Sequence, residues 1–241
     1  MAGDPGTNSG PEADTGPEAG VGPAMDVAFF ASWIEEAARA VSTDRERLTA
    51  LDAAIGDADH GSNLDRGFTA VAHALGTADP ATPGALLTLV GTTLIRKVGG
   101  ASGPLYGTFF REAGRALGDD AQVSLARLHA ALEAGLAGVR ALGSAAEGDK
   151  TMVDALAPAV RALEEAVRDD GEPSDRADRA KVAGAIGAAA SAARAGAGAT
   201  IPLQAHKGRA SYLGPRSVGH EDPGAASTAL ILAALHAVAT R

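Results

Sequence analysis

Apolar residues follow a helical spacing along most of this chain. Phe30, Trp33, Ile34, Ala37 and Val41 recur at intervals of three and four positions, which is the period of an α-helix that buries one face. The same pattern predicts further helices at about 44–52, 64–75, 82–97, 104–117, 123–142, 151–168, 174–195 and 225–240. No run of alternating β-branched residues competes with it. Short connections favour antiparallel neighbours, so we expect an all-α fold of about eight antiparallel helices in a bundle or closed helical barrel.

The first 24 residues differ in composition from the rest of the chain. They are mostly Gly, Pro, Ala and acidic residues, without a periodic apolar face. Such a segment cannot bury enough apolar surface to offset the entropy that it loses on ordering. We therefore expect a disordered tail over residues 1–24 and one helical domain over residues 25–241. Met25 stands where order is expected to begin, so an over-extended start site would explain the tail equally well.

Composition and charge narrow the class of protein. Hydrophobic residues make up 46% of the 241 positions but aromatic residues only 3%, so Ala, Leu and Val must build the core. The formal net charge is -9 without a block of Lys or Arg, which argues against nucleic-acid binding. There is no Cys and no apolar run of about 18 residues, and the first basic residue is Arg39. We expect a soluble, cytoplasmic protein without disulfides, a transmembrane helix or a signal peptide.

Three aspartates lie close together in segment 51–63. Asp57 and Asp59 are two positions apart in a Gly-flanked loop, and Asp52 ends the helix before it. Side chains two apart on an extended backbone point the same way, and carboxylates this close repel one another unless a cation compensates. Oxygen ligands without Cys suit Mg²⁺. The alternative is that these residues are ordinary turn formers and helix caps.

Three further loops carry glycine-rich or basic signals. Residues 99–103 precede an apolar helix, and their backbone N–H groups could hold an anion or simply form a turn capped by Ser102. Lys150 could neutralise phosphate or be a solvated loop lysine. Arg209 and Arg216, in the long loop 207–224, offer forked donors to phosphate or to an acidic neighbour. Antiparallel helices would gather these loops at one end, where with the aspartates they suit a metal–nucleotide site.

In this order, the four segments resemble the L subunit of the dihydroxyacetone kinase family, which also occurs as the C-terminal domain of single-chain kinases. The resemblance runs from about Phe29 to the C-terminus. It implies an eight-helix antiparallel barrel that binds ADP or ATP at one end through two Mg²⁺ ions. Residues 25–241 would then be the nucleotide-binding domain.

The resemblance also implies a set of site residues. Asp52, Asp57 and Asp59 match the metal ligands of the family. The residues that match its nucleotide contacts are His60, Gly61, Ser62, Asn63, Ala101, Ser102, Gly143, Met152, Arg209, Asp222, Pro223 and Gly224. Two positions depart from the family pattern, since Ala58 stands where Gly is common and Pro215 where Glu is common. If the Gly position needs a positive φ, Ala58 costs on the order of 1 kcal/mol.

Partner proteins follow from the same resemblance. In the family, dihydroxyacetone sits on a separate K subunit, and in bacterial three-part systems an M subunit fed from phosphoenolpyruvate recharges the nucleotide. This chain is then expected to be the nucleotide-carrying phosphotransferase subunit, with no covalent phospho-residue and with neither nucleic acid nor membrane as a partner. Two alternatives remain, an ATP-dependent kinase half acting on another triose or tetrose and a regulatory binding module. The three clustered carboxylates favour the catalytic role.

Overall fold

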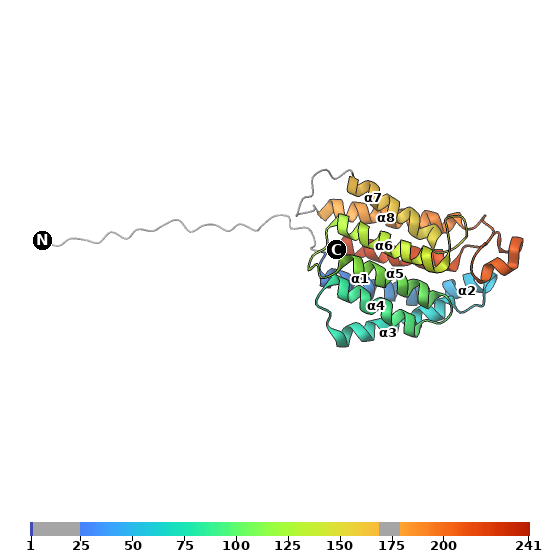
Figure 1. The fold of residues 1–241 in the computed structure, drawn as a ribbon, viewed down its shortest axis with the longest axis horizontal. Helices are drawn as coiled ribbons and strands as arrows, with labels where there is room; N and C mark the ends of the chain where they lie inside the picture. The colour runs from blue at the N-terminus through green and yellow to red at the C-terminus, as the bar shows by residue number, and fades with distance from the viewer. Residues whose placement is uncertain (2–24, 169–178) are drawn as a thin grey trace.

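The structure, a computed structural model, describes residues 1, 25–168 and 179–241 (Figure 1). Apart from Met1, the expected tail lies outside the described residues, and so do residues 174–178 of one expected helix. The described residues contain no strand and no helix that is long and apolar enough to cross a membrane. Their helices are α1 (Val27–Thr43), α2 (Arg45–Ile55), α3 (His60–Ala78), α4 (Pro83–Lys97), α5 (Ser102–Leu117), α6 (Leu125–Gly143), α7 (Val153–Arg168), α8 (Arg179–Ala199), the 3-10 helix η1 (Arg209–Ser217) and α9 (Pro223–Ala239).

Eight of these helices close into a barrel. Each packs on two ring neighbours, in the order α1, α3, α4, α5, α6, α7, α8, α9 and back to α1. Short connections join α3 to α4, α4 to α5, α5 to α6 and α6 to α7, and ring neighbours run antiparallel. The short helix α2 lies at one end of the barrel beside η1, on the right in Figure 1. The all-α barrel predicted from the sequence is confirmed.

Aromatic side chains mark the centre of the core. Trp33, Phe30, Phe68 and Phe110 are fully buried. The ring of Trp33 lies 6.0 Å from that of Phe30 and 5.7 Å from that of Phe110, measured between centroids. The indole N–H of Trp33 donates to the Ile231 carbonyl at 2.8 Å, which joins α1 to α9. Leu, Val and Ala fill the remaining interior, as the low aromatic content requires.

Local capping signals start several helices. Asp26, Thr82, Ser124 and Asp222 each accept a backbone N–H from three positions further on, which satisfies one of the free donors of the first turn. These caps agree with the boundaries expected from the sequence to within a few residues.

Two segments near one end differ from the sequence expectation. Helix α3 begins at His60, one turn earlier than expected, because Asp52 Oδ2 accepts the N–H groups of Asp59 at 2.8 Å and of His60 at 3.1 Å. The capping group therefore comes from the preceding helix. The long loop before α9 is partly helical, since residues 209–217 form η1 around Gly214, which has a φ of 55°.

Candidate functional site: a metal and nucleotide cavity

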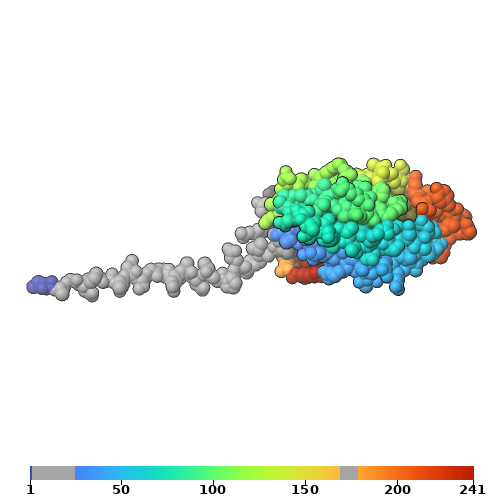
Figure 2. Space-filling model, turned by 90° about the horizontal axis from the view of Figure 1, so that it is seen from below, coloured from blue at the N-terminus to red at the C-terminus, as the bar shows by residue number. Residues whose placement is uncertain are grey.

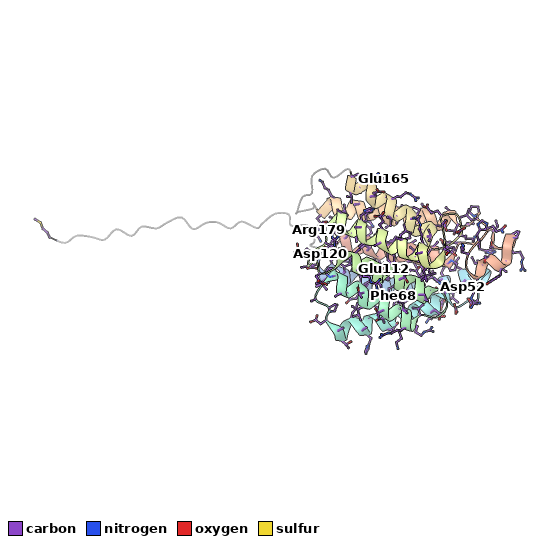
Figure 3. All side chains as sticks on the ribbon, in the orientation of Figure 1. Asp52, Phe68, Glu112, Asp120, Glu165 and Arg179 are labelled. Carbon is purple, nitrogen blue, oxygen red and sulfur yellow. The ribbon has the colours of Figure 1, made fainter. Side chains whose placement is uncertain are left out.

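One cavity of about 480 Å³ opens at the end of the barrel that carries α2 and η1, a usual size for a small-molecule site. Figure 3 shows Asp52 at this end, whereas Asp120 and Arg179 lie at the opposite end. In Figure 2, the orange residues around 200–217 form the tip of the molecule next to α2. The cavity is thus built where the loops of the barrel converge.

The three aspartates predicted as metal ligands meet at this cavity. One carboxylate oxygen from each of Asp52, Asp57 and Asp59 lies within 4.8 Å of the others. Asp52 is buried, and a Cβ on Gly56 would lie 2.0 Å from its Oδ1, so only glycine fits beside it. Arg209 Nε contacts Asp57 Oδ2 at 3.0 Å. Three carboxylates against one guanidinium leave excess negative charge, so the donor set fits a divalent cation that prefers oxygen ligands.

Ala58 adopts a left-handed backbone between two of these aspartates. Its φ is 63°, a conformation that costs a residue with a Cβ about 1–2 kcal/mol. The positive φ considered for this position is therefore present, and the backbone of Ala58 is strained. The ligand atoms still converge, because Asp52 holds the N–H groups of Asp59 and His60 on the far side of the strained residue.

Four helices point their N-termini at the cavity. Its lining includes the residues that open α3, α5, α7 and α9, among them His60, Ser102, Val153 and Pro223. The first N–H groups of a helix lack intrahelical partners, and the helix dipole adds positive potential there. Four such ends beside a cation site form a place for phosphate groups.

A buried hydrogen-bond network connects three of these helices. His60 Nδ1 lies 3.0 Å from Ser102 Oγ, and its Nε2 lies 2.8 Å from Ser227 Oγ. The Tyr106 hydroxyl lies 2.6 Å from Ser227 Oγ and donates to the Gly224 carbonyl at 3.0 Å. Burial lowers the pKa of His60, although Asp52 and Asp59 oppose this effect. His60 is thus a neutral linking residue of α3, α5 and α9.

The other wall of the cavity is apolar. Leu105, Val139, Leu142 and Met152 line it together with Gly143. Leu142 is 53% exposed. An apolar slot next to a phosphate-binding end matches the two halves of a nucleotide, a flat base and a charged tail.

Twelve of the fifteen residues predicted for the site line the cavity. The exceptions are Gly61, Ser62 and Asn63. A Cβ on Gly61 would lie 2.1 Å from the Arg45 carbonyl oxygen, so this glycine lets α2 and α3 pack closely. Ser62 Oγ donates to the Asp59 carbonyl at 2.9 Å, and Asn63 Oδ1 accepts from Arg66 at 2.7 Å. Direct contact of any of the fifteen residues with a metal or a nucleotide stays a prediction.

Lys150 has neither of the two roles considered from the sequence. Only 1% of it is exposed, so it is not a solvated loop lysine. Its Nζ donates to three backbone carbonyls, of Thr200 at 2.8 Å, Leu203 at 3.1 Å and His220 at 2.5 Å. An ammonium has three N–H donors, and all three are used, so none is left for phosphate.

Several lining residues were missed at the level of sequence. Lys207 lines the cavity close in the chain to Arg209, and the Lys-Gly-Arg run was a local signal for it. Tyr106 and Ser227 gave no such signal, because they lie on helices whose pattern is otherwise that of core residues. Asp222 was predicted, and burial raises its pKa to about 7 while its carboxylate caps α9 at the Ala225 N–H, 2.7 Å away.

The chain is similar to known proteins over most of its length. The model of the DAK2 domain matches residues 54–237. The ADP-binding subunit DhaL of the PEP-dependent dihydroxyacetone kinase of Escherichia coli is 41% identical over 201 residues, covering 83% of this chain and 91% of that protein. The corresponding subunit of kinase 2 of Listeria innocua is 40% identical over 210 residues, covering 86% of this chain and 93% of that protein.

A solved structure agrees with the fold. The dihydroxyacetone kinase from C. freundii in complex with AMP-PNP and Mg²⁺ has a TM-score of 0.64 and 27% identity, and the likeness covers 97% of this chain. This chain spans only 38% of that kinase. Because the family model covers most of the chain and the DhaL subunits match it nearly end to end, the chain belongs to the DAK2-domain family.

Proposed function

We propose that this chain is the nucleotide-binding subunit of a dihydroxyacetone kinase, holding ADP or ATP together with Mg²⁺. One observation carries the proposal. The carboxylates of Asp52, Asp57 and Asp59 converge within 4.8 Å beside four helix N-termini in a cavity with an apolar wall. The relatives named as ADP-binding subunits, and the kinase solved with AMP-PNP and Mg²⁺, support the same ligand pair.

Each part of the cavity then has a role in binding. The three aspartates would hold the metal, two ions being expected, and the metal would supply positive charge that neutralises the phosphates. The N–H groups at the starts of α3, α5 and α9 would bind the phosphate oxygens, and Arg209 would add a forked donor. Gly143 and Met152 would contact the base. Phosphoryl transfer depends mostly on such positioning and charge neutralisation, so no covalent intermediate on this chain is required.

The acceptor is proposed to sit on a separate K-type subunit. The DhaL relatives are themselves named as ADP-binding subunits of their kinases. The named relatives are PEP-dependent, which supports an M-type phosphocarrier as the donor that recharges the nucleotide. The proposed setting is the cytoplasm.

Isothermal titration with ADP in the presence and absence of Mg²⁺ tests this proposal. Asp57→Asn keeps the size of the side chain and removes one ligand charge, so Mg²⁺-dependent ADP binding should fall by at least about tenfold while the helical circular dichroism stays unchanged. Asp65→Asn is the matched control, because Asp65 faces Arg45 at 3.8 Å and does not line the cavity. Unchanged ADP affinity in Asp57→Asn would exclude the aspartates as the metal site.

A further inference from the structure

Lys150 is a buried cation that the proposed nucleotide site does not use. It belongs to the turn before α7, and its backbone has a φ of 63°, which a lysine adopts only where its surroundings impose it. Burying an ammonium is costly unless its donors are satisfied. Here the three carbonyls described above satisfy it, so the arrangement is specific rather than incidental.

The three carbonyls belong to both ends of one segment. Thr200 and Leu203 are the first and fourth residues after α8, whereas His220 lies two positions before Asp222, the cap of α9. One ammonium therefore holds together the two ends of the segment between α8 and α9, residues 200–220. Neighbouring bonds reinforce this closure, since the Gly219 N–H donates to the Ile201 carbonyl at 2.8 Å and the His206 N–H donates to the Asp149 carbonyl at 3.0 Å.

This segment carries two basic residues of the cavity. Lys207 and Arg209 line the cavity from it, and Arg209 reaches Asp57. The side chain of Arg209 is 67% exposed, so its own packing does little to place it. The apolar support of the segment is a small cluster in which Ala205 and Ala210 pack with Ile55 of α2. The position of Arg209 thus depends heavily on how the base of the segment is fixed.

We propose that Lys150 is a positioning residue whose ammonium fixes residues 200–220 against α7 and thereby holds Arg209 at the phosphate end of the cavity. The effect on nucleotide binding rests on the proposed function of the chain. The role of Lys150 in fixing residues 200–220 does not. Lys150 acts through Arg209 and the backbone, and it does not touch the nucleotide.

The first experiment removes the charge and keeps the bulk. Lys150→Met should weaken binding of Mg²⁺ and ADP by at least about tenfold, the loss expected when a charge-assisted contact is misplaced. In the ligand-free variant, trypsin should cleave after Arg209 and Arg216 faster by a similar factor, because the segment loses its closure. Leu86→Ala is the control, since Leu86 is buried near the start of α4, at the other end of the barrel. It should lower the melting temperature and leave both quantities within about twofold.

The second experiment replaces the missing group from solution. Lys150→Ala removes the atoms of a propylammonium ion, and Lys150 is one of the residues that line the cavity. Propylammonium should restore ADP affinity and trypsin resistance in Lys150→Ala. Tetramethylammonium, which carries the same charge without N–H donors, should restore neither.

Three results would overturn the proposal. The first is that Lys150→Met keeps the ADP affinity and trypsin resistance of the wild type. The second is that it loses no more of either than a Leu86→Ala control of equal melting temperature. The third is that tetramethylammonium restores both in Lys150→Ala as well as propylammonium does. Failure of the wild-type protein to bind Mg²⁺ and ADP would instead contradict the nucleotide function. In that case the trypsin measurements still decide whether Lys150 fixes the segment.

Discussion

Replacing Ala58 by glycine tests the backbone of the loop that carries Asp57 and Asp59. Ala58 is exposed and has a φ of 63°, so its Cβ makes little packing contact and still incurs the steric cost of the left-handed region. The loop cannot relax into another conformation, because Asp52 holds the N–H groups of Asp59 and His60 directly after it. Ala58→Gly should therefore stabilise the ligand-free protein.

The size of the effect follows from two opposing terms. Relief of the left-handed alanine gives about 1–2 kcal/mol, whereas the greater freedom of glycine in the unfolded chain costs about 0.4–1 kcal/mol. The net gain in the free energy of unfolding is about 0.5–1 kcal/mol. For a domain of this size about 1 kcal/mol corresponds to about 2–4 °C, so we expect the melting temperature to rise by about 1–4 °C.

Ala53→Gly provides a matched control. Ala53 is also exposed but lies inside α2, where glycine costs about 1 kcal/mol relative to alanine. The same chemical change five positions away should therefore lower the melting temperature by about 2–4 °C. Both variants can be compared by differential scanning calorimetry without ligand. A fall of similar size in the two variants would refute the left-handed strain at Ala58.

Three further predictions concern the same end of the barrel. ADP with Mg²⁺ at about 100 times the dissociation constant should add about 2.7 kcal/mol to the free energy of unfolding and raise the melting temperature by about 5–10 °C. ADP, Mg²⁺ or dihydroxyacetone alone should change the melting temperature little. A clear rise with dihydroxyacetone alone would place the substrate site on this chain. Tyr106→Phe should lower the free energy of unfolding by about 1–2 kcal/mol and weaken ADP binding in titrations. Tyr212 is 89% exposed, so Tyr212→Phe should change neither quantity. Burial raises the pKa of Asp222 from 3.8 to about 7, so the folded state binds this proton more tightly and Asp222 destabilises the ligand-free fold as pH rises from about 4 to about 7. Asp222→Asn keeps the cap on α9 and should reduce the difference in urea stability between pH 5 and pH 8; an unchanged difference would show that Asp222 does not titrate in this range.

Much of this molecule could be predicted from the sequence because the signals are local. The stripe from Phe30 to Val41 faces the core along α1, as its spacing predicted. The three aspartates are only a few positions apart, so any turn after α2 brings them near one another, and the structure places their oxygens within 4.8 Å. Ala58 has the positive φ that was considered for this position. The strain could be predicted because the alanine, standing where glycine is common, is visible in the sequence itself.

Other features depend on partners far away in the chain. No local pattern shows that Lys150 donates to carbonyls 50, 53 and 70 positions later, so its chemistry alone suggested phosphate. Tyr106 meets Ser227 and Gly224 only because α5 and α9 converge at one end of the barrel. Helix α3 starts at His60 because its cap is supplied by Asp52 of the preceding helix.

The division has a physical reason. Helical periodicity, caps and clustered charges act within a few residues, and an isolated stretch of sequence already contains both members of each interaction. Buried hydrogen bonds between helices need the closed barrel, which places donors and acceptors from distant segments together and removes them from water. The sequence by itself therefore determined the helices and the aspartate loop after α2. Only the tertiary structure decided which polar side chains line the cavity and which ones hold the loops around it.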